Sequence, residues 1–393
     1  MHVSEKVRRI APAPIDIVNA RVRGIRAAGG TVINLGQAVP GFSIVPEASE
    51  NARQVLDEED THIYSADAGI LPLREALSKT MWQRNKVEVD PQREVIITAG
   101  ANQAFMLAML TLLEPGDKVL LPSPFFLNHA MAVRIAGGVP IEIPLSEESG
   151  FQLRLEDVVP YLDTKPRALV IVSPNNPTGA VYDPVEIQQI AHTLAPKGIA
   201  LISDETYQYF TYKGSQHFSP ASLPEVRPQV ITIGSFSKTF NMTGWRVGFL
   251  IAEPDFIQEA IKVQDTMLIC APVIAQKAVL GVLQEIPRFL EQRLEILGRR
   301  RKLFIERLAD IPQLNWHPTN GGFFAFTRVE ECRDSMSLAL NILDSTHVAT
   351  IPGSAFGQYS EGYLRLSYGS VELADLEEAC NRLAHYFKTA PKI

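Results

Sequence analysis

One lysine of this chain stands among residue types that bind phosphate groups. Lys238 lies in the run Ser-Phe-Ser-Lys-Thr-Phe-Asn-Met-Thr-Gly-Trp-Arg that begins at Ser235 and ends at Arg246. A lysine amine in this setting can form a Schiff base with a carbonyl compound. Most lysines are solvated surface charges, so Lys238 by itself does not indicate catalysis. Its position does, because it follows the apolar run 230–234, and ligands of open α/β sheets bind at the carboxyl ends of buried strands.

Three other apolar runs are followed by polar residues that could do chemistry. Asn-Asn-Pro-Thr-Gly at 175–179 supplies amides, although the same residues also form ordinary turns. Asp204 supplies a carboxylate, which in isolation more often caps the next element. Gly100 precedes a helical pattern, and the N–H groups of a helix start suit a phosphate, although an ordinary turn would look the same. The four segments together predict a site for a phosphorylated carbonyl compound.

The elements that must position these residues are short and regularly spaced. Helical patterns at 102–113 and 184–194 fill two of the gaps between apolar runs, and the second is long enough for a parallel crossover. The gap before the last run is short and not clearly helical, which allows one strand to be reversed. We expect an α/β fold whose large domain has a mostly parallel seven-stranded sheet. The seven runs are 94–98, 118–121, 141–145, 168–172, 199–202, 230–233 and 247–252.

The remainder of the chain predicts a smaller α+β domain. Residues 256–308 have helical spacing with breaks at Pro272 and Pro287, 321–326 and 363–367 are typical of strands, and 371–387 of a closing helix. We expect three segments: the small domain's N-terminal part, the large domain and the small domain's C-terminal part. They are 1–45, 46–285 and 286–393.

Composition indicates a large enzyme. The chain has 393 residues, 46% of them hydrophobic, and a net charge of -7, which argues against nucleic acid as the main partner. The three cysteines are far apart and in no metal-ligand spacing, so we expect neither disulfides nor a metal. No run of 18 apolar residues and no signal-peptide pattern occurs, so we expect a cytoplasmic protein.

These motifs together resemble the class I aminotransferases of the aspartate aminotransferase fold, which are pyridoxal-phosphate enzymes of fold type I. Ser-Phe-Ser-Lys, Asn-Pro-Thr-Gly and Asp-x-x-Tyr occur in the family's order, and the likeness runs from about Gly36 to Arg365. The resemblance implies that Lys238 holds pyridoxal phosphate covalently and shuttles a proton. It also implies that Asp204 pairs with the pyridine nitrogen.

The resemblance assigns further residues to the cofactor. Asn176 and Tyr207 match the pair that bonds the phenolic oxygen, and Phe126 the aromatic that stacks on the ring, with His129 near Asp204. Tyr64 matches a tyrosine that crosses a dimer interface, which implies a homodimer with shared active sites. The expected phosphate-binding residues are Gly100, Ala101, Asn102, Ser235 and Arg246.

The resemblance also implies the substrate contacts. Arg365 matches the arginine that binds the α-carboxylate, since a planar fork of donors suits a carboxylate, and Gly36 and Asn176 complete this side of the site. The substrates are then an L-amino acid and a 2-oxo acid that react in turn by a ping-pong mechanism.

The side chain of the substrate is less well defined by the sequence. Some acidic-substrate members carry a lysine at the place of Asn102, and this chain does not, which favours neutral, aromatic or methionine-like amino acids without excluding aspartate. Leu-Gly-Gln at 35–37 resembles kynurenine and methionine transaminases, but Ala38 and Val39 depart from them. Four phenylalanines could line an apolar pocket or belong to the core. They are Phe125, Phe126, Phe323 and Phe324.

Other functions use the same residues or are excluded by missing ones. A pyridoxal-phosphate β-lyase acting on cysteine-type substrates would use the same lysine and arginine. The effector half of a transcription regulator would need a DNA-binding module, for which about thirty residues before the likeness are too few. The fingerprints of dehydrogenases and P-loop kinases do not occur.

Overall fold

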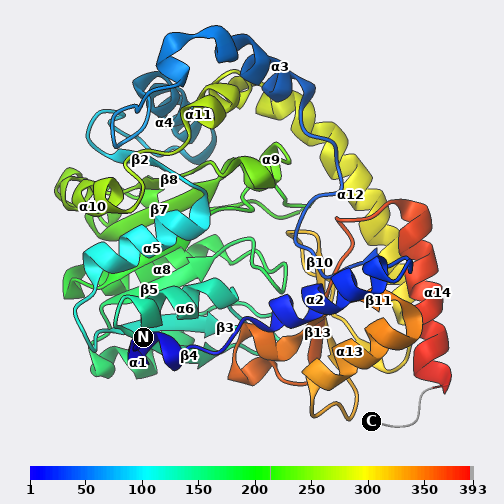
Figure 1. The fold of residues 1–393 in the computed structure, drawn as a ribbon. Coiled ribbons are helices and arrows are strands. Elements are labelled where there is room, and N and C mark those ends of the chain that lie inside the picture. The colour runs from blue at the N-terminus through cyan, green and yellow to red at the C-terminus, as the bar shows by residue number, and fades with distance from the viewer. Residues whose placement is uncertain (213, 390–393) are drawn as a thin grey trace.

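The centre of the protein is a seven-stranded sheet (Figure 1). The computed structural model describes residues 1–212 and 214–389. The strands lie in the order β2-β8-β7-β6-β5-β3-β4, and β8 runs antiparallel to both of its neighbours while the others are parallel. The predicted mostly parallel sheet and its one reversed strand are confirmed. The strands are β2 (Val95–Thr98), β3 (Lys118–Ser123), β4 (Val139–Pro144), β5 (Ala168–Val172), β6 (Ala200–Asp204), β7 (Val230–Ser235) and β8 (Gly248–Ile251).

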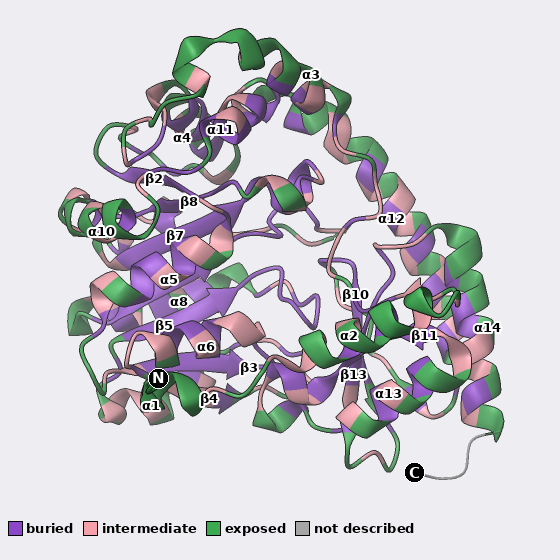
Figure 2. Ribbon diagram, viewed as in Figure 1, coloured by how far each residue is buried: buried purple, intermediate pink, exposed green. Residues whose placement is uncertain are grey.

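Helices cover both faces of this sheet, which explains why its strands are almost continuously apolar. Successive side chains of a strand point to opposite faces. On β5, for example, Leu169 and Ile171 belong to the apolar cluster that includes residues of α4, α8 and α11, whereas Val170 belongs to the cluster that includes residues of α5, α6 and α10. Figure 2 shows the buried strands between helices whose outer sides are exposed. These helices are α4 (Leu71–Asn85), α5 (Ala101–Leu112), α6 (Leu127–Ile135), α8 (Pro184–Leu194), α10 (Pro254–Met267) and α11 (Val273–Leu280).

A second, smaller layer is built from the two ends of the chain. Its antiparallel sheet has the order β12-β13-β10-β9, and β1 (Ile33–Asn34) pairs in parallel with β11 (Val348–Ala349). The α+β character expected for this part is confirmed, and the division at residues 45 and 285 stays a prediction. Its elements are β9 (Leu314–Asn315), β10 (Phe324–Val329), β12 (Ile351–Pro352), β13 (Tyr363–Ser367), α2 (Pro14–Ala27), α13 (Ser335–Thr346) and α14 (Leu373–Thr389).

The long helix α12 (Ile286–Ala309) runs from the large sheet's side of the molecule to the small one (Figure 1). The expected helical region breaks where the prolines predict: α11 begins directly after Pro272, and Pro287 lies in the first turn of α12. No helix among the described residues is long and apolar enough to cross a membrane. The remaining helices are α1 (Glu5–Arg8), α3 (Pro46–Gln54), α7 (Leu155–Val158) and α9 (Phe236–Thr239).

The reversed strand β8 can pack against β7 because of one glycine. Gly234 faces Phe249 across the antiparallel pair, and a Cβ atom at Gly234 would overlap the Phe249 ring. We predict that Gly234→Ala lowers the free energy of unfolding by about 1–3 kcal/mol, as overpacking does. Gly24→Ala in the exposed part of α2, where the new Cβ meets no atom within 4 Å, is the control and should raise stability by roughly 0.5–1 kcal/mol. Urea unfolding of both variants and the wild type measures the free energy of unfolding. Equal values for Gly234→Ala and the wild type would contradict the prediction.

Candidate active site

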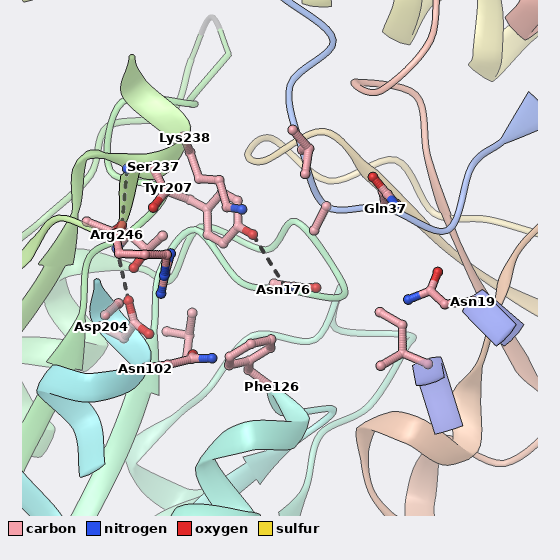
Figure 3. A pocket seen from close by; sticks show the side chains of 17 residues that line it. Asn19, Gln37, Asn102, Phe126, Asn176, Asp204, Tyr207, Ser237, Lys238 and Arg246 are labelled. Carbon is pink, nitrogen blue, oxygen red and sulfur yellow. Dashed lines mark hydrogen bonds between the residues drawn. The ribbon is translucent and has the colours of Figure 1, made fainter. Parts of the chain in front are cut away.

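A cavity of about 380 Å³ lies at the carboxyl ends of the central strands (Figure 3). Residues of β5, β6 and β7 and of the turns after them form its inner wall, and α2 with the segment 37–39 forms the outer one. The predicted strand ends therefore do meet. The lining residues are Ile15, Asn19, Gln37, Ala38, Val39, Ala101, Asn102, Phe126, Val172, Asn176, Asp204, Thr206, Tyr207, Ser235, Ser237, Lys238 and Arg246.

Lys238 reaches the cavity from the single-turn helix α9. Ser235 ends β7 and caps this helix, with its Oγ accepting a hydrogen bond from the Ser237 N–H at 3.1 Å. Burial, together with the positive charges of Arg246 and Arg365, lowers the pKa of the Lys238 amine to about 8. The amine is therefore neutral, and nucleophilic, at a pH where an ordinary lysine is charged.

Asp204 is fixed by hydrogen bonds at the end of β6. Its Oδ1 accepts from the Thr206 N–H at 3.0 Å, and its Oδ2 lies 3.2 Å from Nε2 of His129. The His129 ring stacks on Phe105 with centroids 4.0 Å apart, so the histidine cannot easily turn away. The expected place of His129 beside Asp204 is confirmed by this distance. A carboxylate with a fixed position and few partners can pair with a cationic ring nitrogen.

A chain of side chains leads from the buried Arg365 to the cavity. Arg365 donates from Nη1 to Oδ1 of Asn176 at 2.8 Å and from Nη2 to the carbonyl oxygen of Gly36, and Asn176 Nδ2 donates to the Tyr207 hydroxyl at 3.5 Å. Burial raises the pKa of Tyr207. The Tyr207 hydroxyl therefore keeps its proton and can act as a donor.

Arg365 is only 2% exposed, and its Nε has no hydrogen-bond partner. Burial lowers its pKa to about 10, which leaves it charged at neutral pH. Among the residues that the structure describes, no carboxylate forms an ion pair with it. Because buried cations need an anionic partner, this unpaired guanidinium beside the cavity indicates a site for an anionic ligand.

Gly100 and Arg246 shape the far end of the cavity. Gly100 has a φ of +84°, and a Cβ there would lie 2.5 Å from Nη2 of Arg246. The guanidinium donates to the carbonyl oxygens of Ala99 and Thr243 at 3.1 and 2.9 Å, which aligns it with the start of α5. Free N–H groups at a helix start, serine hydroxyls and a guanidinium together suit a phosphate dianion.

Some predicted residues lie beside the cavity and one lies outside it. Arg365 donates to the lining residue Asn176, Gly100 lies against Arg246, and Gly36 accepts from Arg365, but none of the three lines the cavity itself. Tyr64 is 76% exposed and borders a separate hollow that also contains Cys270. Within the described residues of one chain, Tyr64 therefore has no place in the site.

Only one of the four candidate phenylalanines faces the cavity. Phe126 lines it, whereas Phe323 and Phe324 are fully buried and pack around Tyr207. Phe125 is buried as well and borders a different, smaller hollow. For these three residues the alternative of core packing is correct.

Eight lining residues were not among the predicted site residues. Ser237 and Thr206 lie inside motifs that had been singled out, and the alternation of neighbouring side chains could have found them. Nothing in the sequence relates α2 to the strand ends, so its two residues carried no signal. The eight are Ile15, Asn19, Gln37, Ala38, Val39, Val172, Thr206 and Ser237.

Comparison with known proteins shows the family. A model described as Aminotransferase class I and II matches residues 30–383. The chain belongs to this family. It is 35% identical to aromatic-amino-acid aminotransferase 2 of Thermococcus litoralis over 99% of both chains, and 36% identical to an aspartate aminotransferase of Pyrococcus abyssi over 98% of this chain and 97% of the other. The solved structure of the Thermus thermophilus aspartate aminotransferase with maleate is similar, with a TM-score of 0.92 and 32% identity over 98% and 99% of the two chains.

The protein is therefore an aminotransferase, and enzymes of this class use pyridoxal phosphate. The cavity fits that cofactor, because it combines an anion-binding end, a carboxylate, a hydroxyl donor and an amine with a lowered pKa. Its substrates are an amino acid and an oxo acid, as the family implies.

The lowered pKa of Lys238 can be measured in the protein without cofactor. We predict that acetylation of Lys238 by trace acetic anhydride, followed by peptide mass spectrometry, rises with a midpoint near pH 8. At that pH its neutral fraction is roughly a hundredfold that of an ordinary lysine. The same lysine in urea-unfolded protein is the control, and its midpoint should lie at about pH 10.4. Equal midpoints in the folded and the unfolded protein would show that the fold does not shift the pKa of the Lys238 amine.

Proposed function

We propose that Lys238 binds pyridoxal phosphate covalently and carries the proton between the α-carbon of an L-amino acid and the cofactor. The enzyme moves the amino group to a 2-oxo acid in two half-reactions. The observation that carries this proposal is the amine of Lys238, whose pKa is lowered to about 8, in a cavity that also holds Asp204 and an anion-binding end. A neutral amine is needed both for bond formation and for taking up a proton.

The remaining residues of the cavity hold the cofactor. Asp204, fixed by His129 and the Thr206 N–H, keeps the ring nitrogen protonated, and Tyr207 and Asn176 donate to the phenolic oxygen. When bound, the cofactor withdraws electrons from the substrate's α-carbon. Phe126 would pack against the cofactor ring. The residues that would hold the phosphate group are Gly100, Ala101, Asn102, Ser235 and Arg246.

Arg365 binds the α-carboxylate of the substrate. Its Nε is unpartnered, and its present partners, the Asn176 amide and the Gly36 carbonyl, are neutral. A carboxylate that approaches from the cavity supplies the missing anion and can replace or share these bonds. This contact places the bond to be broken within reach of Lys238.

The lining of the outer wall favours a neutral or aromatic amino acid. Ile15, Ala38 and Val39 are apolar, and Asn19 and Gln37 are polar but uncharged. Among the described lining residues the cations are Lys238 and Arg246, which belong to the cofactor side. Asn102 offers no charge to a second carboxylate. The relatives named for aromatic amino acids and for aspartate are about equally identical to this chain in sequence. The proposed substrate preference therefore rests on the lining of the cavity.

The decisive experiment is a visible-absorption titration of the purified holoenzyme. Amino acids added one at a time should bleach the band of bound cofactor, an oxo acid should restore it, and aromatic or other neutral donors should have the highest kcat/KM. Lys238→Ala should slow the reaction by at least about 10²–10⁴-fold, the usual contribution of a proton-transfer group.

Several results would contradict these assignments. Aspartate as by far the best donor would overturn the substrate preference. Pyruvate and ammonia from a cysteine-type substrate, without reversible bleaching, would indicate a β-lyase instead. Reversible bleaching by the Lys238→Ala variant at the wild-type rate would remove the lysine from its role.

We also propose that the enzyme works as a homodimer in which Tyr64 reaches the phosphate cup of the other copy. Apolar side chains around Tyr64 are exposed, and residues 61–64 lie against 270–273 at one surface hollow. Such exposed apolar side chains mark interaction surfaces where they gather. The exposed residues are Leu56, Ile63, Tyr64, Met267 and Leu268.

Tyr64→Phe tests this assignment. It should leave a dimer in sedimentation velocity but weaken binding of pyridoxal phosphate, because a hydrogen bond to a charged group contributes about 1.5–3 kcal/mol. Tyr359→Phe, an exposed tyrosine of the small domain, is the control and should bind as the wild type does. A wild type that is monomeric and fully active at micromolar concentration would overturn the proposal.

A further inference from the structure

A second carboxylate lies directly after Asp204 and faces the other side of the chain. The Glu205 side chain is inaccessible to solvent. Its Oε1 accepts from the hydroxyls of Ser203 and Ser219 at 3.1 and 2.6 Å, and its Oε2 accepts from Nδ2 of Asn85 at 3.2 Å. The ionisable ring of His217 also lies close, with its Nε2 3.3 Å from Oε2. Burying a carboxylate in this way costs free energy unless such donors surround it.

The two neighbouring carboxylates hold the same turn from opposite sides. Asp204 bonds the Thr206 N–H on the cavity side. On the far side Glu205 binds segments distant in sequence, the end of α4 through Asn85 and the segment after the turn through Ser219. The Glu205 N–H also donates to the carbonyl oxygen of Ile233 on β7 at 2.8 Å.

The hydrogen bonds around Glu205 fix both ends of the turn that carries Tyr207. Asn85 Nδ2 also donates to Oε1 of Gln208 at 3.0 Å, and the Gln208 N–H donates to the Glu205 carbonyl oxygen at 3.0 Å. Tyr207 lies between these two anchored residues. A displacement of Glu205 would therefore move the carboxylate of Asp204 and the hydroxyl of Tyr207 together.

The charges around Glu205 come from three elements. His217 faces it from the segment after the turn. Tyr209, which follows the turn, has a pKa raised to about 12, chiefly by burial with Glu205 adding to the shift. Arg84 of α4 lies over the Tyr209 ring with its guanidinium carbon 4.4 Å from the centroid.

We propose that Glu205 is a positioning residue of this enzyme: its buried carboxylate fixes the turn 204–208 and so sets Asp204 and Tyr207 against the cofactor. This inference rests on the cofactor roles proposed above for those two residues. Glu205 itself does not line the cavity. Its effect therefore acts on cofactor affinity and electronic state through its neighbours, and substrate binding at Arg365 is largely spared.

The test compares Glu205→Gln with a matched surface variant. The pair of Glu225 with His192 has the same residue types at 2.8 Å but is exposed, so Glu225→Gln is the control. For each holoenzyme we would measure the cofactor dissociation constant by equilibrium dialysis, the pH midpoint of the visible band, kcat and KM, and the melting temperature.

Glu205→Gln should weaken cofactor binding about tenfold, which corresponds to 1.4 kcal/mol. It should also lower the pH midpoint of the band by roughly half a unit, because removing a negative charge disfavours the protonated chromophore. We expect kcat to fall with KM nearly unchanged. Glu225→Gln should match the wild type in all five quantities.

The outcomes separate this inference from the assignment of the site. A variant that melts earlier but keeps the wild-type dissociation constant and pH midpoint would show that Glu205 only stabilises the fold, and would overturn the inference. A wild type that has no visible band would overturn the cofactor site itself. Should Glu205→Gln fail to fold, Ser219→Ala removes one donor to the same carboxylate and should weaken cofactor binding about threefold. A wild-type cofactor dissociation constant in Ser219→Ala would count against the inference.

Discussion

The parallel alignment of β5, β6 and β7 is the constraint on which the active site depends. Parallel strands end at one edge of a sheet, so Asn176, Asp204 and Lys238 arrive there from three segments of the chain. The crossover from β5 to β6 contains the helix α8, which packs against the sheet, whereas the described part of the crossover from β6 to β7 contains only short 3-10 helices. The same arrangement therefore builds the core and places an amide, a carboxylate and an amine around one cavity.

Positive charge exceeds negative charge around the cavity, and this excess explains the lowered pKa of Lys238 and the anionic ligands that the cavity suits. Lys238 and Arg246 line it and Arg365 lies directly behind it, whereas Asp204 is the only carboxylate among the described lining residues. Two fixed guanidinium charges and burial make a third cation unfavourable, so the pKa of Lys238 falls to about 8. The cationic ends match an anionic phosphate and an anionic carboxylate, and the amine between them loses its proton more readily than an ordinary lysine does.

Sequence patterns predicted the features that short segments of the chain determine. They missed the features that depend on how distant segments pack together. The strand runs, the motif around Lys238 and the turn after Asp204 are local, and their order along the chain follows from the parallel sheet. The burial of Phe323 and Phe324 depends on how β10 packs against Tyr207, and a phenylalanine has the same pattern in a core as in a pocket. Ile15 and Asn19 face the cavity only because α2 folds back over it from the far end of the chain, so no local pattern marks them.

The segment 36–45 links the substrate side of the site to the lysine side. It begins at Gly36, whose carbonyl accepts from Arg365, and ends at Val45, whose N–H donates to the carbonyl of Phe240, two residues after Lys238. In between, Phe42 packs against Arg293 and Arg300 of α12, with guanidinium carbons 5.3 and 5.4 Å from its ring centroid.

Arg293 extends this link, because its guanidinium donates to the carbonyl of Thr239, next to Lys238, and to that of Ser43 at 3.1 Å. A movement of the small domain with α12 would thus be transmitted to the wall formed by residues 37–39 and to α9. One peptide segment joins the group that binds the substrate's carboxylate to the helix that carries the reactive amine. Arg365 and Lys238 must therefore be positioned together. This explains why a site whose reactive groups lie on the large sheet also needs the second, smaller layer.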